Sequence, residues 1–116
     1  MVSISNADVI EYNESINESD WWCKDELLDS CFSSYYYYYG NELEQISSIF
    51  RGLAKNHAFS NGNKRTAAAV LTIFLLQNGY EMDENDLISL TEEVINNNFE
   101  VTEIAEKIFK LIRPIN

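Results

Sequence analysis

The sequence of 116 residues is poor in basic side chains: eight Lys and Arg stand against nineteen Asp and Glu, a formal net charge of −11. Proteins that grip nucleic acid use clustered Lys and Arg on phosphate, so we expect no direct nucleic-acid binding. The same charge argues against docking on an anionic membrane surface. The chain also lacks the roughly 18 consecutive apolar residues of a membrane-spanning helix. Both absences leave a soluble domain with a protein or small-molecule partner as the expectation.

Cysteine is scarce as well. Cys23 and Cys31 form neither a CxxC pair nor a metal-ligand cluster. The first thirteen residues have no basic start and no apolar stretch, so they do not resemble a secretory signal. A small domain with so few cysteines is typical of a reduced compartment, and we expect a cytoplasmic protein.

The residues that are present predict one helical domain spanning 1–116. Length fits a single domain, and a hydrophobic content of 46% is enough for a core. Apolar residues recur at three- and four-residue spacing, which is typical of amphipathic helices. The predicted class is all-α, a compact bundle of about six helices with a small flap or hairpin. The predicted helices are Ala7–Ile16, Asp25–Phe32, Glu42–His57, Asn63–Asn78, Asp86–Ile95 and Val101–Ile112.

One of these helices is predicted to be the central one. From Ala67 to Leu76 the sequence reads AAAVLTIFLL, apolar on almost every side, and a helix apolar all round is buried all round. Gly79 follows as the residue after its C-cap. Pro114 is predicted to end the last helix.

The chemistry is concentrated between residues 57 and 67, where the sequence reads HAFSNGNKRTA. Ser60 to Asn63 are residues that favour tight turns and positive φ. A turn of this kind at a helix start leaves backbone N–H groups free to bind an anion. Alone, such a segment is most often only a turn.

Lys64 and Arg65 occupy the first helical turn, where a cation faces the positive end of the helix dipole. The arrangement makes sense if a phosphate sits at the helix start. From Gln45 to Tyr80 the chain has four basic residues and no acidic one. His57, the single histidine, precedes the turn and is placed to accept a proton from a hydroxyl nucleophile. Phe59 is an aromatic that can anchor the loop in the core.

The segment resembles the signature of the Fic/Doc family, HxFx[D/E/N][A/G]N followed by basic residues, and its NKRTA ending is similar to the Doc (death-on-curing) branch. Fic enzymes continue with a second glycine and later a second arginine, where this chain has Lys64 and Ala68. ADVIEYN, DELLDSCFSS, GNELEQISSIFRGLAKN and LLQNGYEM also match the layout of short Doc-like proteins. The resemblance covers most of the chain.

The resemblance implies roles for the motif residues. His57 would be the general base and Phe59 the anchor of the loop, while Lys64 and Arg65 would act in catalysis by holding the phosphate chain. Nucleotide phosphates would be bound by five positions in a row: Asn61, Gly62, Asn63, Lys64 and Arg65. The family's acidic position is Asn61 here, a weak and doubtful metal ligand, so Mg²⁺ would be carried mainly by the nucleotide.

The implied activity is that of a Doc-like toxin of a type II toxin–antitoxin module. Such a protein kinase transfers the γ-phosphate of ATP to a threonine of elongation factor Tu and so inhibits translation. Two alternatives stay open: AMP transfer to a protein hydroxyl in the Fic manner, and a catalytically weakened copy, suggested by Asn61, that is kept to bind an antitoxin.

Two further expectations follow from the resemblance. Tyr36, Tyr37 and Tyr38 lie in an aromatic stretch where the family has a flap that docks the target by β-augmentation; a loop covering the core is an equally good interpretation. The self-inhibitory pattern [S/T]xxxE[G/N] is absent, because Tyr80 stands four residues before Glu84-Asn85. Inhibition would then come from a Phd-type antitoxin acting in trans.

Overall fold

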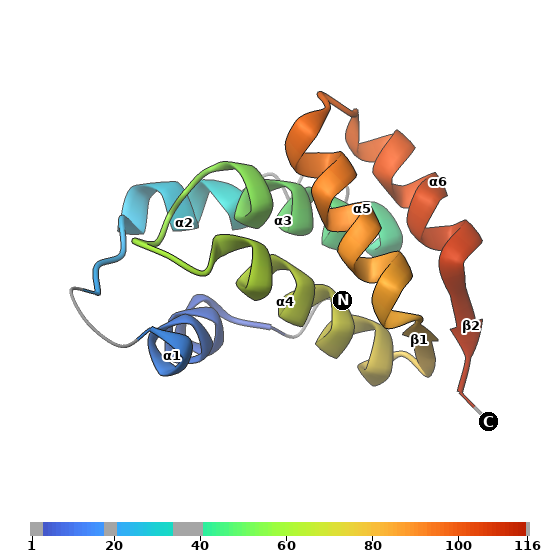
Figure 1. The fold of residues 1–116 in the computed structure, drawn as a ribbon, viewed down its shortest axis with the longest axis horizontal. Helices are drawn as coiled ribbons and strands as arrows, with labels where there is room; N and C mark the ends of the chain where they lie inside the picture. Colours follow the sequence, from blue (N-terminus) through green and yellow to red (C-terminus); the bar gives the residue numbers. More distant parts are fainter. Residues whose placement is uncertain (1–3, 18–20, 34–40, 116) are drawn as a thin grey trace.

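A computed structural model describes residues 4–17, 21–33 and 41–115, and Figure 1 shows their arrangement. These residues form six helices and a small two-stranded antiparallel sheet, which confirms the all-α class. The predicted flap residues Tyr36, Tyr37 and Tyr38 lie outside the described residues. The elements are α1 (Asn6–Ile16), α2 (Asp25–Ser33), α3 (Glu42–Lys55), α4 (Asn63–Gln77), β1 (Tyr80–Met82), α5 (Glu84–Asn96), α6 (Val101–Leu111) and β2 (Ile112–Pro114).

The helix at the centre of the bundle is α3, and not α4 as the apolar run predicted. α3 packs against α2, α4, α5 and α6, and nine of its residues are buried. The polar residues in its sequence do not indicate such a central position. Ser47 can be buried at little cost because its hydroxyl donates to the Leu43 carbonyl at 2.6 Å. Gly52 lets α2 approach so closely that an added Cβ would stand 2.9 Å from the Cys31 sulfur.

The helix α4 is buried on one side only. Phe74 and Leu75 lie in the core, whereas Ile73 is 43% and Leu76 51% exposed. The prediction that this helix is buried all round is therefore wrong. α4 packs mainly against α1, α3, α5 and β1 (Figure 1), and Ile73 and Leu76 lie on its exposed side.

A two-stranded antiparallel sheet joins the two ends of the C-terminal half, with β1 after α4 and β2 after α6. Tyr80 pairs with Pro114 and Met82 with Ile112, and an ion pair of 2.9 Å links Glu81 to Arg113. Pro114 therefore lies in a strand. The last helix ends earlier, at Leu111, because Ile112 turns to extended backbone. Three-residue strands are too short to give an alternating pattern in the sequence.

No helix within the described ranges is long and apolar enough to span a bilayer.

Candidate functional site

The site is built on the turn that joins α3 to α4. α3 ends at Lys55, so His57 lies two residues beyond the helix and not on its last turn. Its backbone is left-handed, with φ of 51°, and it is the only non-glycine residue with positive φ in the described chain. A side chain in this conformation costs roughly 1–2 kcal/mol. His57 is exposed, and no hydrogen bond to its side chain occurs within the described part.

Asn63 and Phe59 hold the turn closed. The ring of Phe59 is 2% exposed and lies in the core. The Phe59 N–H donates to Asn63 Oδ1 at 3.2 Å, and Asn63 Nδ2 donates to the Phe59 carbonyl at 3.1 Å. The Asn63 side chain thus makes both of its bonds within the turn, and what it offers the hollow is its backbone N–H.

The segment before α2 runs antiparallel beside the turn. Lys24 N–H donates to the Ala58 carbonyl at 2.7 Å, and Ser60 N–H donates to the Trp22 carbonyl at 3.1 Å. Between them, Cys23 faces Phe59 in a single β-bridge. Sequence reasoning missed this support, because nothing local to residues 21–24 indicates that they pair with a turn about 35 residues later.

A second support comes from α1. Asn13 is 0% exposed, and its Nδ2 donates to the Asn61 carbonyl and to the Thr66 hydroxyl oxygen, both at 2.9 Å. Its Oδ1 accepts from Trp21 Nε1 and from Asn17 Nδ2, again at 2.9 Å. Both donors and both acceptor positions of this buried amide are therefore satisfied. The sequence gives no sign of these contacts.

The first turn of α4 has no side chain that caps it. Ser5, Asn41 and Asp83 accept hydrogen bonds at the starts of α1, α3 and α5. In α4 the N-cap residue is Gly62, left-handed with φ of 73°, and the first helical bond runs from Thr66 N–H to the Gly62 carbonyl at 2.9 Å.

The N–H groups at the first three positions of α4, Asn63, Lys64 and Arg65, consequently have no acceptor in the described part of the protein. Together with the helix dipole, they make this helix start attractive to an anion.

The three residues that carry these groups line a hollow of about 380 Å³. The structure brings the predicted phosphate-binding residues and His57 to its wall, and places Phe59 in the core. The wall also includes the apolar side chains of Ala54 and Ile95, which the sequence did not indicate. The full lining is Ala54, His57, Ser60, Asn61, Gly62, Asn63, Lys64, Arg65 and Ile95. None of these residues is acidic.

The two cations at the hollow differ in their surroundings. Lys64 Nζ lies 3.0 Å from Glu92 Oε1 of α5, and both side chains are about half exposed. Arg65 has no hydrogen-bond or ion-pair partner among the described residues. Residues 45–80 contain no acidic residue, but the fold brings Glu92 to them because α5 packs against α4.

Neither cysteine offers a nucleophile near the hollow. Burial raises the pKa of Cys31 to about 11. Burial, followed by the charge of Asp25, also raises the pKa of Cys23. Both are thiols at neutral pH, and thiolates are the reactive form. No group of three or more His, Cys, Asp or Glu side chains in the described ranges could hold a metal ion.

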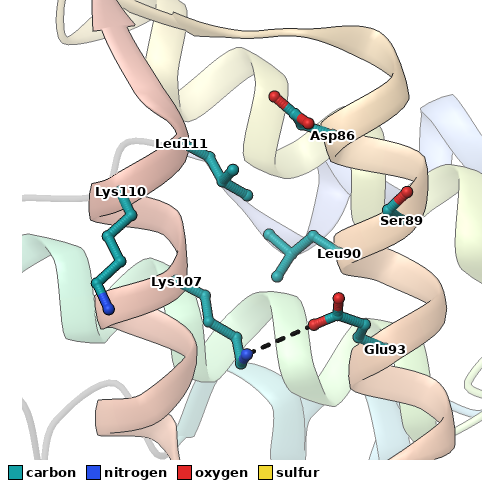
Figure 2. A pocket seen from close by; sticks show the side chains of 7 residues that line it. All are labelled: Asp86, Ser89, Leu90, Glu93, Lys107, Lys110 and Leu111. Atoms are coloured by element: carbon teal, nitrogen blue, oxygen red, sulfur yellow. Dashed lines mark ion pairs between the residues drawn. The ribbon is translucent and has the colours of Figure 1, made fainter.

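A smaller hollow of about 240 Å³ lies between α5 and α6, away from the motif (Figure 2). Across it, Lys107 Nζ lies 3.5 Å from Glu93 Oε2. Two of its four charged side chains thus form an ion pair with each other, and no histidine lines it. The hollow at the start of α4 is therefore the stronger candidate for chemistry.

Comparison with protein-family models agrees with this choice. Residues 25–75 match the model of the Fic/DOC family, a transferase family. The matched region runs from the start of α2 almost to the end of α4 and contains the whole segment from His57 to Ala67. The match is to the family as a whole and not to its Doc branch. Comparison with curated proteins found no match.

Proposed function

We propose that the protein is a phosphotransferase of the Doc type that moves the γ-phosphate of ATP to a hydroxyl of a translation factor, elongation factor Tu by resemblance. One observation carries the proposal: an uncapped helix start with three unpaired N–H groups shares a hollow with an exposed histidine. The family match over the same residues supports it.

The proposed reaction uses these groups in turn. The N–H groups at the start of α4 and the guanidinium of Arg65 hold the phosphate chain. His57 accepts the proton of the target hydroxyl, whose oxygen forms a bond to the γ-phosphorus. The bond from that phosphorus to the bridging oxygen breaks, and ADP leaves. The exposed position of His57 leaves it accessible to a protein substrate.

Mg²⁺ is proposed to arrive with the nucleotide. The residues of the hollow offer it only amide and hydroxyl oxygens, and Asn61 Oδ1 already accepts from the Gly62 N–H at 2.8 Å. Mg²⁺ prefers carboxylates and phosphates, so the phosphates of ATP would hold it and compensate their charge.

AMP transfer in the Fic manner is the second candidate, because the family match does not separate the two reactions. The sequence favours the kinase, since Ala68 stands where Fic enzymes place a second arginine for the triphosphate. A weakened copy retained for antitoxin binding is the third candidate, and the neutral Asn61 and the Lys64–Glu92 ion pair favour it.

The proposed regulator is a Phd-type antitoxin acting in trans, in a type II toxin–antitoxin module in the cytoplasm. Two features of the chain support this: it has no self-inhibitory pattern, and its net charge of −11 suits a partner with basic residues.

The test is incubation of the protein with elongation factor Tu and ATP labelled at the γ- or the α-phosphate. We expect label from the γ-phosphate in wild type, and loss of about 10²–10⁴-fold in rate in His57→Ala. Lys110→Ala is the matched control, an exposed change on α6 that should keep full activity. Label from the α-phosphate would identify AMP transfer, and no label from either position would contradict an active enzyme.

A further inference from the structure

We infer that Asn13, a buried residue of α1, is a positioning residue for the anion site: it fixes the peptide between Asn61 and Gly62 so that the Gly62 N–H joins the free N–H groups of α4. This inference rests on the proposed function, because it concerns how the same site holds phosphate.

The first step of the argument is the orientation of one peptide. In a trans peptide the carbonyl and the following N–H point in opposite directions, and the described chain contains no cis peptide bond. The Asn61 carbonyl is turned inward, onto Asn13 Nδ2 at 2.9 Å. The Gly62 N–H of the same peptide must therefore point away from Asn13, and both Asn61 and Gly62 line the hollow.

The second step is the present partner of that N–H. It donates to Asn61 Oδ1 at 2.8 Å, and Asn61 is an exposed residue whose side chain can rotate away. A phosphate oxygen can replace this amide oxygen without leaving a buried group unpaired. The exchange is favourable because a charged acceptor makes the stronger hydrogen bond.

The third step is why Asn13 can impose this orientation. Its Oδ1 accepts from Trp21 and Asn17, so the amide cannot follow the loop if the peptide rotates. Asn17 Nδ2 also donates to the Asn61 carbonyl, but at the longer distance of 3.4 Å, so Asn13 makes the shorter bond that sets the peptide. It also donates to Thr66 at 2.9 Å, one turn into α4, so the same side chain sets the loop relative to the helix. Gly62 fits tightly: an added Cβ would stand 2.9 Å from an Ile16 methyl and 3.3 Å from Asn13 Nδ2.

The experiment compares Asn13→Ala and Asn13→Asp with wild type in two measurements on the full chain. Asn13→Asp keeps the shape of the side chain but replaces the Nδ2 donor with an acceptor oxygen. This variant provides the measurement if Asn13→Ala fails to fold. NMR reports the carbonyl ¹³C signal of Asn61 and the amide signal of Gly62. Calorimetric titration reports the affinity for tripolyphosphate and for ATP.

Two further variants separate positioning from general weakening. Ile108→Val loosens the core in α6 without touching the loop, so it should keep the two NMR signals and wild-type affinity at temperatures where it is folded. Trp21→Phe removes one of the two bonds that anchor Asn13 Oδ1 and leaves the Nδ2 donors in place, so it should move the same signals by less than the Asn13 variants do.

We expect both Asn13 variants to move the Asn61 and Gly62 signals and to lose tripolyphosphate affinity by roughly tenfold to 100-fold. Unchanged signals or unchanged affinity in both variants would overturn the inference, as would an equal loss in Ile108→Val. Failure of the proposed function would give a different result. Wild type would bind tripolyphosphate and the Asn13 variants would bind it more weakly, but wild type would transfer no label from ATP.

Discussion

The two ends of α4 each have a glycine in the left-handed region, and they are built differently. At the N-terminal end, Gly62 has φ of 73° and is enclosed by α1. At the C-terminal end, Gly79 has φ of 83°, and an added Cβ would meet nothing within 4 Å. The second glycine only allows the chain to turn into β1, whereas the first also allows α1 to approach. The N-terminal end of α4 is crowded although no side chain caps it. This combination indicates that the end does more than change the direction of the chain.

The largest effect we expect tests the C-terminal end of α4. Phe74→Ala should lower the free energy of unfolding by about 3–5 kcal/mol, because it empties a buried site. Leu76→Ala, two residues later on the open face, should change it by no more than about 0.5 kcal/mol. Urea unfolding followed by circular dichroism measures both. Similar losses would mean that the outer face is covered.

The second prediction compares the two glycines directly. Gly62→Ala combines an unfavourable φ with contacts to Ile16 and Asn13, and should cost about 2–5 kcal/mol. Gly79→Ala meets only the unfavourable φ and should cost about 1–2 kcal/mol. The same urea experiment applies. If the two costs were equal, the enclosure of Gly62 by α1 would not matter to stability.

The smallest effect concerns the charge at the N-terminal end. Glu92→Gln removes the partner of Lys64 and should raise the affinity for tripolyphosphate by roughly twofold to fivefold at low salt, because exposed ion pairs are weak. Glu93→Gln is the matched control, since Glu93 pairs with Lys107 away from the hollow. Calorimetric titration measures both. An equal gain in the two variants would show a general charge effect and no specific competition for Lys64.

The parts of the fold that sequence reasoning predicted are those with local causes. Six helices follow from apolar spacing, and four helix starts were predicted correctly, those of α2, α3, α4 and α6 at Asp25, Glu42, Asn63 and Val101. The centre of the bundle was misplaced, because burial of Ser47 depends on a bond to its own helix and burial of Gly52 on contact with α2. Neither effect leaves a periodic signal. The three-residue strands were missed for the same reason.

The same distinction between local and distant causes applies to the candidate site. The segment from His57 to Arg65 is continuous, so its turn, cations and histidine are visible in the sequence. The groups that hold it are distant: Asn13 acts from α1, Trp22 from the segment before α2, and Glu92 from α5. A single sequence gives no pairing between such positions. The left-handed backbone of His57 was also unforeseen, because the turn residues Ser60 to Asn63 were the ones expected to adopt positive φ.

The bond from Asn13 to the Asn61 carbonyl spans 48 positions in the chain, and this has a consequence for folding. Closing a loop of that length carries an entropic cost that the bond itself recovers only after α1 has docked on α4. The turn therefore reaches its final shape late, after the local helices have formed. For the same reason, a partial opening that releases α1 while α3 and α6 stay packed would free the peptide between Asn61 and Gly62, whereas the Ser60 N–H would keep its bond to the Trp22 carbonyl. The amide proton of Gly62 should then exchange with solvent together with those of α1, and that of Ser60 more slowly.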